Sequence, residues 1–148
     1  MYTDWVANGL VVLATTLAVS ASVLVHYEGL TRMARWLPTI MGQRRNKVLY
    51  GIFGVVALHV AEIWLFGAVA WALVGVSGVG DVSGADVLGL LDAVYLSAVT
   101  FTTVGFGDLA PVGPIRFLYG MEALTGFVLI TWSASFTYLE MDRFWRAP

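Results

Sequence analysis

The sequence contains no cysteine among its 148 residues, and only 12% of them are charged. The missing cysteine excludes disulfides, thiolate metal sites and cysteine nucleophiles. The charged share is about half of what soluble domains carry, because those need a charged surface toward water. A net charge of -2 gives no reason to expect nucleic acid as a partner. With 59% hydrophobic residues, the chain is therefore predicted to lie in a membrane.

Four apolar runs divide the chain, at residues 9–25, 48–75, 88–101 and 115–139. Three of them suffice for a membrane crossing of about 20 residues, whereas 88–101 is too short and is predicted to be re-entrant or buried. The first run lacks arginine at every third position, which excludes an arginine-rich voltage sensor. Its flank, MYTD, has an acid and no basic residue, which favours a retained helix over a cleaved signal peptide.

The basic residues gather in two places, between the first two runs and at the C-terminal end. Basic segments stay on the cytoplasmic side of a membrane. The segment 76–89, by contrast, holds Asp81 and Asp86 and no basic residue. This pattern predicts three crossings, with the N-terminus outside and the C-terminus in the cytoplasm. Only Arg116, at the start of the last run, would lie outside. The other seven of the eight basic residues are Arg32, Arg35, Arg44, Arg45, Lys47, Arg143 and Arg146.

The segment after the short apolar run, residues 102–108, reads TTVGFGD. Gly105 and Gly107 alternate with larger residues, and glycine readily adopts left-handed backbone angles. A strand that alternates left- and right-handed angles can direct successive carbonyls to one side. Four such strands around an axis would stack rings of carbonyl oxygens, which can replace the water shell of a potassium ion.

Residues 103–108, TVGFGD, resemble the filter of the potassium-channel pore-loop family, whose motif is TVGYG or TVGFG, usually followed by Asp. The resemblance covers about 48–139. It implies an all-α membrane protein with three transmembrane helices, a re-entrant pore helix and an extended selectivity filter, assembled as a tetramer around a central pore. The resemblance implies two parts, an N-terminal transmembrane helix with a basic cytoplasmic linker at 1–47 and a pore domain at 48–148. The pore domain would comprise an outer helix at 48–75, an extracellular loop at 76–90, a pore helix at 91–102, the filter at 103–108 and an inner helix at 114–141.

Within the linker, the stretch 30–41 mixes arginines with apolar side chains at helical spacing. This composition fits a helix lying along the inner membrane surface, and it fits a plain basic loop equally well.

The resemblance implies a potassium-selective channel subunit that conducts passively and is not an enzyme. Three further copies of the chain and membrane lipid are the expected partners, and potassium ions in the filter are the expected ligands, with no other cofactor. A non-selective cation channel and a non-conducting scaffold or accessory subunit remain as alternatives. The residues implied to bind potassium are Thr103, Val104, Gly105, Phe106 and Gly107, with Asp108 at the outer mouth.

The residues behind the filter depart from the family pattern. Relatives often have a Trp pair in the pore helix where this chain has Tyr95 and Leu96, and the Glu that backs the filter in some relatives corresponds to Val99. Phe106 has no hydroxyl to donate to the pore helix. The filter is therefore expected to be held by packing, with polar help from Tyr95 or Ser97. The predicted supporting residues are Tyr95, Ser97, Val99 and Thr102.

Polar residues and one glycine within the spans are the gating candidates. Glu122 is interpreted as a hydrogen-bonded tie between inner and pore helices, or as a proton-sensitive gate. Gly126 is a hinge or a packing glycine. His59 and Glu62 share a helix face, as a structural pair buried against the first or the inner helix or as a pH sensor. Two such residues are too few for a metal site and nothing nearby is expected to complete one, so potassium is the only metal expected. The other candidates are Thr131, Ser135 and Tyr138.

Overall fold

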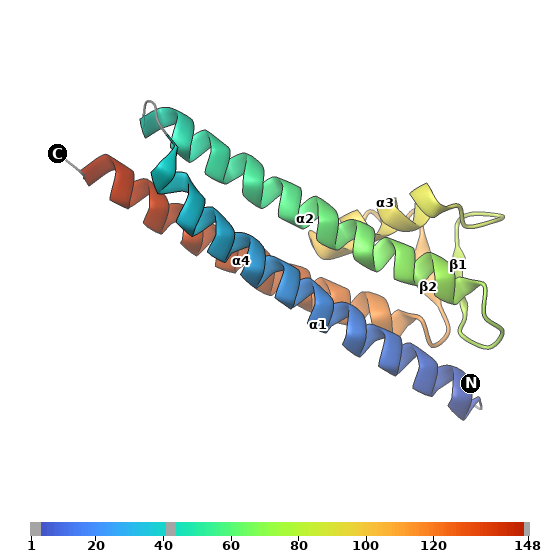
Figure 1. The fold of residues 1–148 in the computed structure, drawn as a ribbon. Coiled ribbons are helices and arrows are strands. Elements are labelled where there is room, and N and C mark those ends of the chain that lie inside the picture. The colour runs from blue at the N-terminus through green and yellow to red at the C-terminus, as the bar shows by residue number, and fades with distance from the viewer. Residues whose placement is uncertain (1–3, 41–43, 147–148) are drawn as a thin grey trace.

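The structure is a computed structural model that describes residues 4–40 and 44–146, with residues 44–45 and 144–146 described by their backbone only. Long helices run side by side, and a short helix lies against them at one end (Figure 1). The described helices are α1 (Trp5–Trp36), α2 (Arg44–Val74), α3 (Leu90–Phe101) and α4 (Arg116–Arg146), with a single 3-10 turn, η1, at Leu37–Thr39.

Three of the described helices are long and apolar enough to cross a membrane, which agrees with the number of crossings predicted. Such segments become helical because every backbone N–H and C=O must find a partner inside the segment when no water is present. α3, with 12 residues, is too short to cross. Large apolar side chains point outward from the long helices, including Leu13, Phe53 and Leu124, which are 58%, 68% and 56% exposed. The long helices therefore carry apolar surface that suits lipid or a second protein chain.

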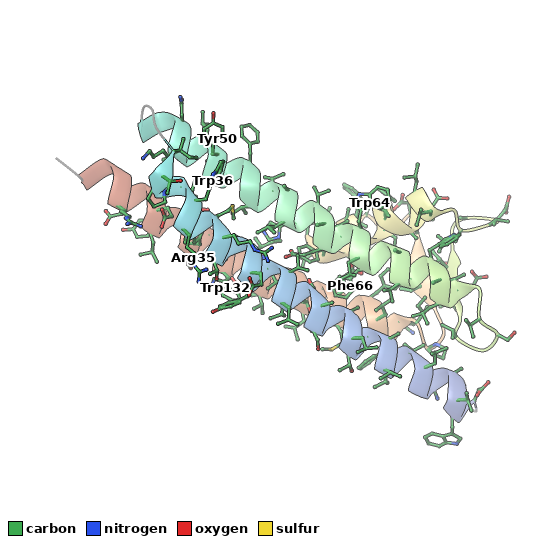
Figure 2. All side chains as sticks on the ribbon, in the orientation of Figure 1. Arg35, Trp36, Tyr50, Trp64, Phe66 and Trp132 are labelled. Atoms are coloured by element: carbon green, nitrogen blue, oxygen red, sulfur yellow. The ribbon has the colours of Figure 1, made fainter. Side chains whose placement is uncertain are left out.

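α1 extends further than its apolar run. Its buried residues recur every three or four positions from Ala7 to His26 and on to Leu30, so the face that packs against α2 and α4 continues past residue 25. Residues 30–36 are helical, so the interpretation as a plain loop is wrong for them. They continue α1 without a break and do not form a separate helix, while residue 41 lies outside the described residues. At this end the rings of Trp36 and Tyr50 lie 6.2 Å apart and join α1 to α2 (Figure 2).

Two short strands make the all-α prediction wrong in detail. β1 (Asp81–Ser83) pairs antiparallel with β2 (Ala110–Val112), with Val82 opposite Pro111. The extracellular loop predicted at 76–90 therefore contains a strand. Strands of 3 residues are too short to show a readable alternation of apolar and polar residues. The pairing ties the segment before α3 to the segment after the filter motif.

The apolar core lies where α3 packs against α2 and α4. Phe66 of α2, Phe101 of α3 and Leu118 of α4 are 0% exposed, and Figure 2 shows Phe66 within the bundle. This core fixes α3, and with it the segment that follows, against the long helices.

The start of α1 lies at the same end of the bundle as α3 and the strands, whereas the end of α1, the start of α2 and the C-terminal end of α4 lie at the other end (Figure 1). The Asp4 carboxylate caps α1 by accepting hydrogen bonds from the N–H groups of Val6 and Ala7, at 3.0 and 3.1 Å. A Cβ added to Gly78 would lie 2.9 Å from this carboxylate, so the start of α1 contacts the loop before β1.

Candidate functional site

The filter motif begins where α3 ends, and local hydrogen bonds define that end. The Thr102 hydroxyl donates to the Ala98 carbonyl at 2.7 Å, and the Thr103 N–H donates to the Thr100 carbonyl at 2.9 Å. The Gly105 N–H donates to the Val99 carbonyl at 3.0 Å. Carbonyls at the C-terminal end of a helix lack intrahelical partners, and here the motif itself supplies them. The motif is thereby anchored against the helix that precedes it.

Left-handed backbone angles recur at every second residue of the motif. φ is +60° at Thr103, +55° at Gly105 and +82° at Gly107, and no other non-glycine residue in the described part of the chain has a positive φ. The alternation expected from the glycine spacing is therefore present, and it extends to a threonine. A β-branched residue in this region is strained, and such strain concentrates at functional segments.

The motif is exposed along its whole length within the single chain, from Thr102 to Asp108. Val104 is 54% exposed and Phe106 is 70% exposed, and a Cβ on Gly105 would meet nothing within 4 Å. Behind the motif, Val99, whose carbonyl accepts from the Gly105 N–H, is buried. The chain thus holds one side of the segment and leaves the other open.

Tyr95 and Asp108 join α3 to the far end of the motif. The Tyr95 hydroxyl donates to the Asp108 carboxylate at 2.8 Å. This hydrogen bond raises the pKa of the Tyr95 hydroxyl above its usual value, which keeps the hydroxyl as the donor. Tyr95 was one of the two polar residues expected to help hold the filter. In the structure it is hydrogen-bonded to Asp108, the residue predicted at the outer mouth.

Ser97, the other polar candidate, faces the interior instead. Its hydroxyl contacts the carboxyl of Glu122 and lies 2.8 Å from the Ile63 carbonyl, so it links α3 with α4 and α2. The Ser97 hydroxyl has one proton and cannot donate to both oxygens. If the Glu122 carboxyl is neutral, it can donate to Ser97 while Ser97 donates to the Ile63 carbonyl, and both hydrogen bonds then form. The contact is the one expected if Glu122 ties the inner helix to the pore helix. A gating role for Glu122 stays a prediction.

Gly126 lies where α4 crosses the end of α3. A Cβ added to Gly126 would collide with the carbonyl oxygen of Phe101, so only glycine lets the two helices come this close. This geometry agrees with the packing interpretation of Gly126. The hinge interpretation stays a prediction.

The exposed face of α4 carries the remaining gating candidates Thr131, Ser135 and Tyr138. The Thr131 hydroxyl donates to the Val128 carbonyl at 2.8 Å, and the Ser135 hydroxyl donates to the Thr131 carbonyl at 3.1 Å. These residues recur at helical spacing on the side away from the buried Ser133. They share one face, as a pore-lining role requires, and the role itself stays a prediction.

His59 and Glu62 belong to a larger group that sequence reasoning missed. Nδ1 of His59 lies 2.9 Å from Oε2 of Glu62, and Nδ1 of His26, from α1, lies 2.8 Å from Oε1. Nε2 of His26 lies 3.2 Å from Oγ of Ser133 on α4. The pair thus packs against α1, and His26 links it to α4. The expectation that nothing nearby adds a third ligand is wrong, because no spacing rule relates residue 26 to residue 62.

Comparison with known proteins places the pore region in a family. Residues 47–139 match a family model described as ion channel. Protein LctB of Geobacillus stearothermophilus is 39% identical over 54 residues, which cover 36% of this chain and 40% of that protein. Protein LctB of Bacillus caldotenax is 38% identical over 58 residues, which cover 38% of this chain and 43% of that protein. The chain thus spans less than half the length of these curated relatives. No solved structure matches the chain with significance.

Proposed function

The chain belongs to the ion channel family whose model covers residues 47–139, and from this premise we propose that it is a potassium-selective channel subunit. The observation that carries the proposal is the TVGFGD segment with positive φ at Thr103, Gly105 and Gly107, directly after α3. Alternating backbone angles allow neighbouring carbonyls to face one axis, where they can replace the hydration shell of potassium. Carbonyls of residues 103–106 and the Thr103 hydroxyl would bind the ion.

The functional unit in this proposal is a homotetramer. One chain contributes one filter strand, and a carbonyl cage needs four of them. The open side of residues 102–108, including the exposed Val104 and Phe106, supports this assembly because further copies would cover it. Thr131, Ser135 and Tyr138 would then face the cavity below the filter.

The proposed orientation places the filter end outside the cell. The acidic loop that holds Asp81 and Asp86 lies at this end, together with the N-terminus (Figure 1). The end of α1 and the start of α2, which carry basic residues, lie at the other end, as cytoplasmic segments do. Asp108, held by Tyr95, would then attract cations at the outer mouth.

Flux from liposomes tests the proposal. The purified protein is reconstituted with a potassium gradient or a sodium gradient, and we expect flux with potassium only. Equal flux of the two ions would favour a non-selective cation channel, and no flux would favour a scaffold that retains the pore fold.

Gly105→Ala sharpens the test, and Gly9→Ala is its matched control. A Cβ at a left-handed residue costs roughly 1–2 kcal/mol per chain, so potassium flux should fall about tenfold or more. Gly9 is helical, and a Cβ there meets nothing within 4 Å, so its variant should conduct normally. Normal selective flux from Gly105→Ala would contradict the proposed filter.

A further inference from the structure

Away from the filter, side chains with metal-binding atoms converge from two helices. His26 of α1 and His59 and Glu62 of α2 form a group whose ligand atoms all lie within 4.8 Å of one another. The two imidazole rings are stacked at 5.4 Å, with the Glu62 carboxylate bonded to both. We propose that this histidine cluster, His26, His59 and Glu62, binds one divalent transition metal ion of the zinc class.

The donor set selects the class of metal. Two imidazole nitrogens and one carboxylate oxygen are the protein ligands of many zinc sites, which keep a fourth position open. Calcium and magnesium prefer sites made of oxygen ligands, so they are disfavoured here. Ligands in tetrahedral zinc sites lie roughly 3.3–3.5 Å apart, given bond lengths near 2.0–2.2 Å. The ligand atoms of the cluster lie up to 4.8 Å apart, so the three side chains would move closer together to bind the ion, with the helices in place.

Ser133 supplies the partner that a metal-binding histidine needs. When Nδ1 of His26 binds the metal, Nε2 carries the ring proton and can donate it to the Ser133 hydroxyl, 3.2 Å away. Metal-binding histidines commonly donate the second ring N–H in this way, which fixes the tautomer and the ring orientation. Ser133 comes from α4 and is 3% exposed. Trp132 covers the same ring, with centroids 5.4 Å apart, so the orientation of His26 is fixed from two sides.

Burial and charge favour a bound cation. His26 and Glu62 have fully buried side chains within the spans α1 and α2, where a carboxylate is costly unless a positive charge accompanies it. No Lys or Arg forms an ion pair with Glu62 among the described residues. His59 is 17% exposed and lines a groove of 470 Å³ between α2 and α4, which gives the ion a route to the cluster.

Cobalt and zinc ions alone, added to the purified full chain, test the site. The chain contains two histidines and no cysteine, so with a tag free of both, any imidazole-bound metal must lie on this cluster. We expect Co²⁺ to give the visible absorption bands of a four- or five-coordinate site, at one ion per chain, and Zn²⁺ to abolish them. Absence of such bands in the wild type would overturn the proposal. This readout is independent of flux, so its failure is distinguishable from failure of the proposed filter.

Matched variants locate the metal. His26→Gln and His59→Gln should each remove the bands, whereas Ser133→Ala should weaken Zn²⁺ binding by about 10–100-fold, as loss of an outer partner does. Ser20→Ala, which removes an exposed hydroxyl of α1 that bonds only its own helix, should change nothing. Unchanged bands in His26→Gln would overturn the proposal.

A third variant tests the site by the appearance of a new signal, even if the glutamine variants fail to fold. His59→Cys keeps a metal ligand in place, and a thiolate at this position should add sulfur-to-cobalt charge-transfer bands. Binding of Co²⁺ without these bands would place the metal elsewhere and overturn the assignment.

Discussion

The filter motif and the histidine cluster are both polar sites within an apolar chain, but they are completed differently. The motif from Thr102 to Asp108 is exposed throughout and is held by its own chain on one side only. In the cluster, the side chains of Glu62 and His26 are 0% exposed, and both carboxylate oxygens find partners within the same chain. One chain thus suffices to build the interior of the bundle, whereas it leaves one side of the filter motif exposed, which further copies would cover in the proposed channel. Changes in the cluster should therefore alter the stability of the chain, and changes at the motif should alter conduction.

Glu62→Ala should have the largest effect on stability. Removing one partner of a buried ionic group costs about 3–5 kcal/mol, because the remaining groups lose their compensation. Here His26 and His59 would both lose their acceptor. The measurement is the free energy of unfolding in detergent.

The control for Glu62→Ala is Glu28→Ala. Oε2 of Glu28 lies 3.7 Å from a guanidinium nitrogen of Arg32 on the exposed face of α1, where an ion pair contributes little to stability. An equal free energy of unfolding for the two variants would contradict the larger stabilising role assigned to the cluster.

Gly126→Ala should have the next largest effect. The added methyl group meets the Phe101 carbonyl, and overpacking of this kind typically costs about 1–3 kcal/mol. Gly120→Ala is the control on the same helix, because a Cβ there meets nothing within 4 Å of the single chain. Lower thermal stability with Gly126→Ala indicates packing, whereas unchanged stability with altered gating would indicate a hinge instead.

Tyr95→Phe should have the smallest effect on stability and should act on conduction. The change removes only the hydroxyl that donates to Asp108, so the outer end of the motif loses a tie while the bundle interior is untouched. We expect unchanged thermal unfolding together with altered potassium flux in liposomes. Tyr27→Phe, at an exposed position on α1, is the control.

The Tyr95 tie also has a pH dependence. The hydrogen bond to Asp108 raises the pKa of Tyr95 above 10.0. A group with a raised pKa contributes fully below its unfolded value and loses that contribution as the pH rises through the raised value. The difference in flux between wild type and Tyr95→Phe should therefore persist up to pH 10 and shrink above it. A difference that vanished near neutral pH would contradict the assigned bond.

The number of spans, the short helix before the motif and the left-handed positions at Gly105 and Gly107 could be predicted from the sequence. Each depends on residues close together in the chain: apolar length decides what can cross a membrane, and glycine decides where positive φ is tolerated. The end of α1 was misjudged, because its buried face continues to Leu30 after the apolar run has ended.

The tertiary structure alone decided which distant residues meet. His26 pairs with Glu62, Ser97 contacts Glu122, and Val82 lies opposite Pro111. Each contact joins two different helices or strands, and periodicity within one element carries no information about the rotation or height of its neighbour. The local sequence thus determined a membrane chain with a glycine-spaced pore segment, while helix packing decided that two histidines and a glutamate would share one site inside the bundle.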